Sequence, residues 1–75
     1  MPNIPTVSSL KLIKVLRKKG FSLNRIHGSH HIFVRYLDKR LVSIPVHKGK
    51  DLGRGITLSI LRDAQITIEE FQKLL

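Results

Sequence analysis

The apolar residues of this chain change their spacing at Gly20, and this change restricts the possible folds more than any other feature. Before Gly20, apolar residues recur at helical spacing from Leu10 to Leu16, with basic residues between them. After Gly20, apolar and polar residues alternate in short stretches, and Gly, Ser and Asp separate these stretches. The sequence therefore predicts an amphipathic helix followed by an antiparallel sheet with tight turns.

Local signals set the limits of these first elements. Ser8 or Ser9 can cap the helix, and Gly20 suits the left-handed position that ends it. Three strands are expected: one that starts at Phe21 and breaks at the turn 27–29, one over residues 30–37, and one over residues 41–46. Because Pro45 cannot donate a hydrogen bond to a neighbouring strand, the third strand is expected at a sheet edge or near its end.

The C-terminal third returns to helical spacing. A second helix is expected from about Arg54, and its apolar side consists of Thr57, Ile60, Leu61 and Ala64. A short third helix is indicated by a capping box, Thr67 with Glu70, and by a hydrophobic staple, Ile66 with Phe71. The predicted class is α+β in the order α-β-β-β-α plus a short C-terminal helix. The two larger helices are expected to cover one face of the three-stranded antiparallel sheet.

Length and composition predict one small domain. The 75 residues are too few for two domains, so residues 1–75 are expected to form one, with an irregular lead-in over residues 1–7 that holds two prolines. Residues 1–9 carry no basic side chain, and no long apolar run occurs, so neither a signal peptide nor a membrane span is expected. The lack of cysteine fits a reducing, cytoplasmic location.

Positive charge is concentrated in the first two thirds of the chain. Lys and Arg number 14 against 5 Asp and Glu, for a formal net charge of +9. Residues 1–50 hold eleven basic residues and one acid, Asp38, whereas residues 51–75 hold three basic residues and four acids. Such asymmetry is typical of proteins that bind a polyanion, and nucleic acid is favoured over an ordinary solvated basic face.

Four histidines are the candidates for chemistry. His27, His30 and His31 lie within five residues, and His47 follows the third predicted strand. Each of them can also be an ordinary exposed or hydrogen-bonded side chain. A metal site needs three or four converging ligands, but carboxylates are scarce here and the surrounding cations would repel a metal ion, so no metal is expected.

Acid–base catalysis on RNA fits this charge pattern better. Cleavage needs a base for the ribose 2′-hydroxyl, an acid for the leaving oxygen and cations for the charge on phosphorus. Gly28 and Ser29 allow close approach of the backbone to RNA. Further phosphate contacts are expected from Arg35, Lys39, Arg40, Lys48 and Lys50. A catalytic serine is not favoured, because no carboxylate partner lies in the same region.

Four segments in their order and spacing carry a family resemblance: "KKGF" (18–21), "GSHHIF" (28–33), "VSIPVH" (42–47) and "LSILRDA" (58–64). Over roughly residues 9–71 the chain resembles the HicA (YcfA-like) family of toxin–antitoxin systems. The resemblance implies a type II toxin that is a metal-independent endoribonuclease acting on mRNA, with a fold like the double-stranded-RNA-binding domain. It also implies that no cofactor is needed and that an acidic HicB-type antitoxin silences the toxin.

The resemblance also assigns site residues. The family's catalytic histidine falls on His30, and the pattern of some members places it on His31 instead. His47 matches a recurring histidine whose role is less defined. Gln65 departs from the glycine that many members carry after the second helix, which affects the expected helix end rather than the chemistry.

Two functions from other classes remain. A non-catalytic RNA-binding module would use the same fold to recognise RNA by its shape and phosphates, but it would have no need of a histidine pair. A DNA-binding subunit is less favoured, because the second helix offers only Arg54 and Arg62 for reading a groove.

Overall fold

The computed structural model describes residues 6–47 and 49–75, and it confirms the predicted order of the main elements. The helices are α1 (Ser9–Lys18), α2 (Arg54–Ala64) and α3 (Ile68–Leu74). The strands are β1 (Val7–Ser8), β2 (Ser22–His27), β3 (His30–Arg35), β4 (Arg40–Pro45) and β5 (Asp51–Leu52). No helix in these described ranges is long and apolar enough to cross a membrane.

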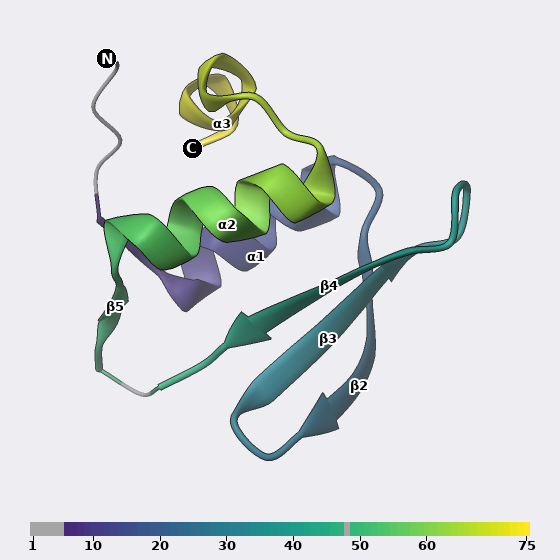
Figure 1. Ribbon diagram of the computed structural model, residues 1–75, viewed down its shortest axis with the longest axis horizontal. Helices are drawn as coiled ribbons and strands as arrows, with labels where there is room; N and C mark the ends of the chain where they lie inside the picture. Colours follow the sequence, from purple (N-terminus) through teal and green to yellow (C-terminus); the bar gives the residue numbers. More distant parts are fainter. Residues whose placement is uncertain (1–5, 48) are drawn as a thin grey trace.

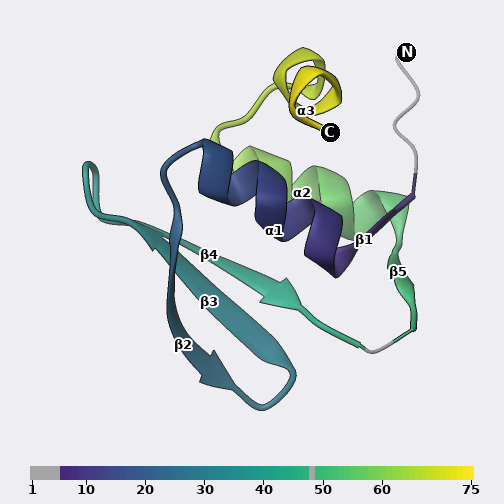
Figure 2. The same ribbon diagram turned by 180° about the vertical axis from the view of Figure 1, so that it is seen from behind.

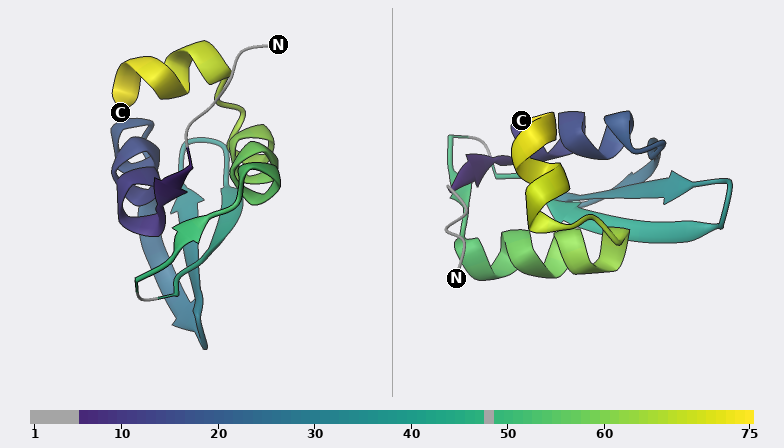
Figure 3. Two further views of the ribbon diagram at one scale, coloured as in Figure 1. Left: turned by 90° about the vertical axis from the view of Figure 1, so that its left-hand side faces the viewer. Right: turned by 90° about the horizontal axis from the view of Figure 1, so that it is seen from above.

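Strands β2, β3 and β4 form one antiparallel sheet in that order, so β4 is an edge strand as Pro45 predicted. Helices α1 and α2 lie side by side on one side of this sheet, and α3 crosses near their ends (Figures 1 and 2). Side-chain contacts agree with this placement. The Arg17 guanidinium of α1 lies 5.9 Å from the ring centre of Phe33, and Arg40 Nη1 donates to the Asp63 carbonyl of α2 at 3.0 Å. The left view of Figure 3 shows α1 and α2 next to each other with α3 across one end, and the β2–β3 hairpin extends away from the helices.

The core lies between the helices and the inner face of the sheet. Phe33, Val42 and Ile44 supply the sheet side of this core and are almost completely buried. The helices and loops contribute Leu12, Val15, Leu16, Phe21, Ile60, Leu61, Ala64, Ile66 and Phe71. Truncation of one such buried phenylalanine to alanine costs about 3–5 kcal/mol. In a domain of this size the total stability is of the same order, so the sheet is held in place mainly by this apolar layer.

The other face of the sheet, which we call the outer face, is not covered by any described helix. Opposed residues of antiparallel strands share a face, so the register assigns its members. They are Ser22, Arg25 and His27 of β2, His30, Ile32 and Val34 of β3, and Leu41, Ser43 and Pro45 of β4. Except for Val34, these side chains are exposed or half-buried. The structure therefore leaves one face of the sheet open for a partner.

Helix α1 begins and ends as predicted, but its apolar side is narrower. The Ser8 hydroxyl accepts a hydrogen bond from the Lys11 N–H at 3.2 Å, and Gly20 takes a φ of +89° after the last turn. Leu10 was expected on the apolar stripe, yet its side chain is 67% exposed. The prediction for Leu10 is wrong because the buried side of α1 consists of Ser9, Leu12, Val15 and Leu16, and at helical spacing Leu10 lies on the opposite side of the helix.

A two-residue ladder joins the start of the chain to the segment before α2. Val7 pairs with Leu52 and Ser8 with Asp51 in antiparallel register, and both apolar side chains are buried. This corrects the irregular lead-in predicted for residues 1–7 at Val7, while residues 1–5 lie outside the described residues. The ladder brings the loop after β4 next to the first turn of α1.

The turn between α2 and α3 confirms the predicted caps. Thr67 and Glu70 form the capping box, and Ile66 and Phe71 are both buried. Gln65 ends α2 in the left-handed region, at φ 58° and ψ 43°, and its N–H donates to the Arg62 carbonyl at 3.1 Å. The helix therefore ends where a glycine would end it, but at a residue whose Cβ makes this conformation costly.

We expect Gln65→Gly to stabilise the protein by roughly 0.5–1 kcal/mol. The glycine removes a left-handed strain of about 1–2 kcal/mol, and part of this gain is offset because glycine makes the unfolded chain more flexible. Urea denaturation of both proteins measures the difference. The control is Gln65→Ala, which keeps the Cβ and is expected to give no gain; equal stabilisation by both variants would contradict the explanation.

Candidate active site

A two-residue loop at one end of the sheet positions the histidines. Strand β2 ends at His27, β3 begins at His30, and only Gly28 and Ser29 connect them. Gly28 has a φ of +62°, which fits a tight hairpin turn with a left-handed first residue. The Ser29 carbonyl accepts a hydrogen bond from the Val46 N–H at 2.7 Å, so the chain after β4 is tied to the same hairpin.

His30 lies on the outer face at this hairpin. Its side chain is exposed, and its opposed residues are His27 on β2 and Pro45 on β4. The predicted catalytic residue is therefore accessible to a large substrate that approaches the uncovered side of the sheet.

His31, the alternative catalytic residue, lies on the inner side because successive side chains of a strand alternate between faces. Its opposed residues are Ile26 and Ile44, and the residue is half-buried. The Nδ1 atom of His31 is buried and has no hydrogen-bond partner among the described residues. One ring nitrogen of His31 is thus closed to a substrate, which makes His30 the better candidate.

His47 follows β4 by two residues and is exposed. It lines one hollow together with Pro45, the residue opposite His30, and a second hollow beside Ser8, Ser9 and Leu10 at the start of α1. Lys50 lines both hollows. The structure thus brings His47 and Lys50 to the end of the sheet that carries His30.

Three of the predicted phosphate contacts lie at the other end of the sheet. Lys48 lies outside the described residues. Arg35, Lys39 and Arg40 belong to the β3–β4 hairpin, five or more residues along from His30, which is roughly 17 Å of strand. Figure 1 shows the two hairpins at opposite ends of the sheet. Of the predicted cations in the described residues, Lys50 therefore lies near the histidines, whereas Arg35, Lys39 and Arg40 do not.

Two of these arginines have intramolecular partners. Arg35 donates to both Asp38 carboxylate oxygens, from Nε at 3.1 Å and from Nη2 at 2.9 Å, and its guanidinium lies 4.7 Å from the ring centre of Phe21. Arg40 Nε lies 3.6 Å from the same carboxylate, in addition to its bond to α2. Their charge is partly used to hold the β3–β4 hairpin against the helices, which leaves Lys39 as the freer cation there.

Sequence patterns assigned no role to two groups of cations, namely Arg25 and a row of lysines on α1. Arg25 is exposed on the outer face, two residues before His27, and forms no ion pair within the described part of the chain. In the sequence, only its place in the basic region pointed to Arg25. The face of the sheet on which it lies depends on the register of β2, which the sequence does not show.

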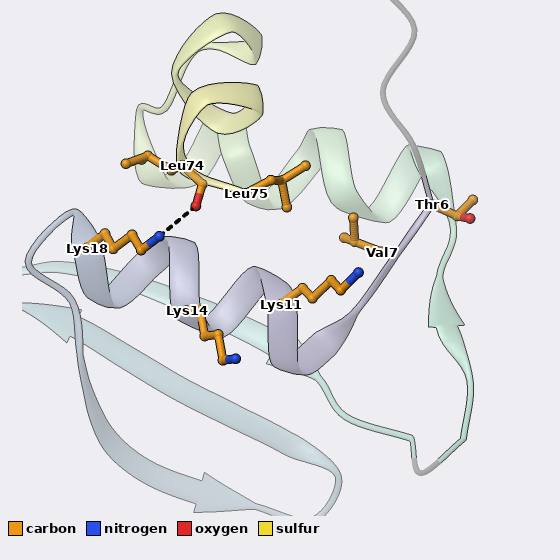
Figure 4. A pocket seen from close by; sticks show the side chains of 7 residues that line it. All are labelled: Thr6, Val7, Lys11, Lys14, Lys18, Leu74 and Leu75. Atoms are coloured by element: carbon orange, nitrogen blue, oxygen red, sulfur yellow. Dashed lines mark hydrogen bonds between the residues drawn. The ribbon is translucent and has the colours of Figure 1, made fainter.

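The second group is a row on α1. Lys11, Lys14 and Lys18 line a hollow beside Leu74 and Leu75, and Lys18 Nζ donates to the Leu74 carbonyl at 2.9 Å (Figure 4). Helical spacing predicted that these lysines share the polar side of α1. Because α1 packs on the inner side of the sheet, this row does not belong to the site at His30.

The described residues contain no group of three or more His, Cys, Asp or Glu side chains arranged to hold a metal ion. The site contains His27 and His30 on the open face of one hairpin, His47 at the same end of the sheet, and the exposed cations Arg25 and Lys50. Such groups can transfer protons and bind an anionic substrate.

Comparison with protein families gives this site a context. Residues 10–66, which include all four histidines and most of the sheet–helix core, match the family described as the HicA toxin of bacterial toxin–antitoxin systems. The chain belongs to the HicA toxin family. This confirms the resemblance carried by the four sequence segments, and membership in this HicA family implies an antitoxin partner. A comparison with curated proteins gave no significant match.

The hairpin that holds Arg35 gives this HicA protein a testable pH dependence. Hydrogen bonds from Arg35 lower the pKa of Asp38 to about 2. Because the pKa is lower in the folded state, the ion pair stabilises the fold fully above the unfolded pKa of about 3.9 and is lost as the pH falls towards the folded pKa. We expect the stability gap between the wild type and Asp38→Asn, measured by urea denaturation, to stay constant above about pH 5 and to shrink between pH 4 and pH 2. A gap that does not change with pH would contradict this role of Asp38.

Proposed function

We propose that this HicA-family toxin is an endoribonuclease that cleaves mRNA, with His30 as its main proton-transfer residue. The observation that supports this most strongly is the position of His30. It lies within the "GSHHIF" segment, inside the region that matches the family, and its side chain is exposed on the open face of the sheet. A surface histidine on an uncovered basic sheet is accessible to a polymer as large as RNA.

The proposed reaction is an attack of the ribose 2′-oxygen on the neighbouring phosphorus. A base removes the 2′-hydroxyl proton, the bond from the 2′-oxygen to phosphorus forms, and the bond to the 5′-oxygen breaks as that oxygen gains a proton. The products are a 2′,3′-cyclic phosphate and a 5′-hydroxyl end. Histidine suits both proton transfers because its usual pKa lies near neutral pH, and cations such as Arg25 and Lys50 would stabilise the charge on phosphorus. Gly28 and Ser29 leave the backbone of the turn open to the same phosphate.

The outer face offers a path for the RNA strand. An RNA that lies along β3 would pass from Lys39 at one hairpin to His30 at the other, beside Arg25 of β2. Lys39 and Lys50 retain exposed positions for phosphate contacts, whereas Arg35 and Arg40 are engaged with Asp38. We therefore place the main phosphate contacts at Lys39, Lys50 and Arg25.

A non-catalytic RNA-binding module is the second candidate, and one observation favours it. Among the described residues, no hydrogen bond orients the ring of His30. Catalytic hydrogen bonds often form only when the substrate is bound, so this does not decide against catalysis. The cleavage assay below separates the two functions.

We also propose that the antitoxin is an acidic protein of the HicB type that covers the outer face. The formal net charge of +9 would attract an acidic partner through fast, steered association. A partner seated on the outer face would block RNA from His30, and it would bury the exposed side chain of Leu41 and the half-buried side chain of Ile32 on the same face. One surface would then serve both the substrate and the inhibitor.

We expect His30→Ala to abolish cleavage of single-stranded RNA while the circular dichroism spectrum and the melting temperature stay nearly unchanged, because His30 is exposed and does not contribute to the core. Loss of one acid–base group lowers the rate by about 10²–10⁴-fold. Cleavage by the wild type should persist in EDTA, because no step needs a metal ion. Gel analysis of the products measures both effects.

The control in the same assay is His31→Ala. Full activity of His30→Ala together with an inactive His31→Ala would move the catalytic role to His31. Cleavage that persists in the double variant would reject histidine catalysis. Binding of RNA without any cleavage by the wild type would favour the non-catalytic module instead.

RNA affinity is expected to fall steeply with salt, because Lys and Arg contacts release counterions from the phosphates. Replacement of Lys50 or Lys39 by alanine should weaken binding to all RNA sequences alike and reduce the logarithmic salt slope by about one. Lys73→Ala on α3 is the matched control and is expected to change neither quantity. Binding isotherms at several salt concentrations measure the slope, and a slope near zero for the wild type would contradict the proposed phosphate contacts.

A further inference from the structure

His27 and His30 occupy directly opposed positions on the two strands of the β2–β3 hairpin. Opposed side chains of an antiparallel pair lie on the same face, with their Cβ atoms about 5 Å apart. Both residues are exposed on the outer face, and only the open turn of Gly28 and Ser29 lies between them along the chain. The hairpin therefore holds two imidazole rings next to each other at the edge of an open surface.

The backbone fixes the register that pairs His27 with His30. Gly28 adopts a positive φ that a two-residue turn of this kind requires at its first central position, and a two-residue loop leaves no freedom to shift the register. Further along, the register of β2 shifts between Leu23 and Arg25, which leaves Asn24 as an additional residue. This additional residue places Leu23 on the inner side, opposite Phe33. Arg25 lies two residues before His27, so the alternation of the strand puts both on the outer face, and the pair of rings has a cation on its own side of the sheet.

We propose that His27 is the second proton-transfer residue of the site and that His27 and His30 divide the acid and base roles in RNA cleavage. This inference rests on the proposed ribonuclease function and adds a residue to it. The reaction needs one group that removes the 2′-proton and another that delivers a proton to the 5′-oxygen, and both oxygens belong to the same phosphorus. Two rings held side by side on one face can contact both, whereas His31 lies on the inner side.

The neighbouring residues do not compete with His27 and His30 for the acid and base roles. On the outer face the row continues from His30 to Pro45, which does not titrate, and no described helix packs over the hairpin. A guanidinium group has hydrogen-bond donors and no acceptor, so Arg25 can bind the phosphate but cannot accept the 2′-proton. His47 lies beyond Pro45 in the loop after β4, so it is farther from His27 than His30 is.

The test compares two substrates with His27→Ala and His30→Ala. The first substrate is an ordinary RNA dinucleotide, and the second is a ribonucleoside 3′-phosphate ester with a 4-nitrophenyl leaving group, which departs without a proton. With the ordinary substrate, each variant is expected to lose about 10²-fold or more. With the activated ester, the variant that lacks the acid should regain activity close to that of the wild type, while the variant that lacks the base should stay impaired.

Further variants and the pH profile complete the design. His27→Gln keeps a polar side chain but cannot replace the proton transfer, so it should resemble His27→Ala, and each variant should lose one limb of the bell-shaped pH profile of kcat/KM. Ser22→Ala, which lies on the same face of β2 at its far end, is the control and should keep wild-type rates.

The outcomes separate this inference from the function on which it rests. Full activity of His27→Ala with an inactive His30→Ala would overturn the role of His27 alone. Impairment of both variants without rescue of either by the activated ester would also overturn the division of roles. Full activity of His30→Ala would overturn the role of His30 and the division of roles with it, but not the ribonuclease activity. Absence of cleavage by the wild type would overturn the proposed function itself.

Discussion

Burial of one face of a three-stranded sheet under two helices is the interaction on which the rest of this structure depends. Phe33, Val42 and Ile44 face α1 and α2, and these residues are almost completely inaccessible to solvent. Because a strand alternates its side chains, the burial of one set leaves the other set on the open side. The same apolar layer that folds the domain therefore also creates the exposed face that carries the candidate chemistry.

The register of the β2–β3 hairpin decides which histidine lies on the open face. A shift by one residue would exchange the faces of His30 and His31. Two features prevent such a shift, namely the short turn at Gly28 and Ser29 and the burial of Phe33 on the inner side. In this arrangement His30 and His27 share the open face, whereas Nδ1 of His31 is buried with no hydrogen-bond partner in residues 6–47 and 49–75. Site chemistry and core packing are therefore linked through the alternation of a single strand.

The excess of positive charge is divided between structure and surface. Arg35 and Arg40 meet Asp38 at the β3–β4 hairpin, and Lys19 pairs with Glu70 at 2.6 Å, which ties the end of α1 to α3. Pairs as exposed as these contribute little to stability, but they fix the directions of the side chains they involve. The cations that remain for a substrate or an acidic partner are the unpaired ones on open surfaces. Among the described residues, Arg25 and Lys50 lie nearest to the histidine end of the sheet.

Local sequence determined the helices, the three strands of the sheet, the edge position of β4, the caps at Ser8 and Thr67 and the turn at Gly28, because each depends on residues a few positions apart. The family was also recognisable from short segments in a fixed order. Only the tertiary structure decided the ladder between Val7 and Leu52, the exposure of Leu10, the engagement of Arg35 with Asp38 and the pairing of His27 with His30. These depend on strand register and on which surfaces meet across the core. Two-residue strands have no periodicity, and the partner of a long cationic side chain is set by distances in space rather than along the chain.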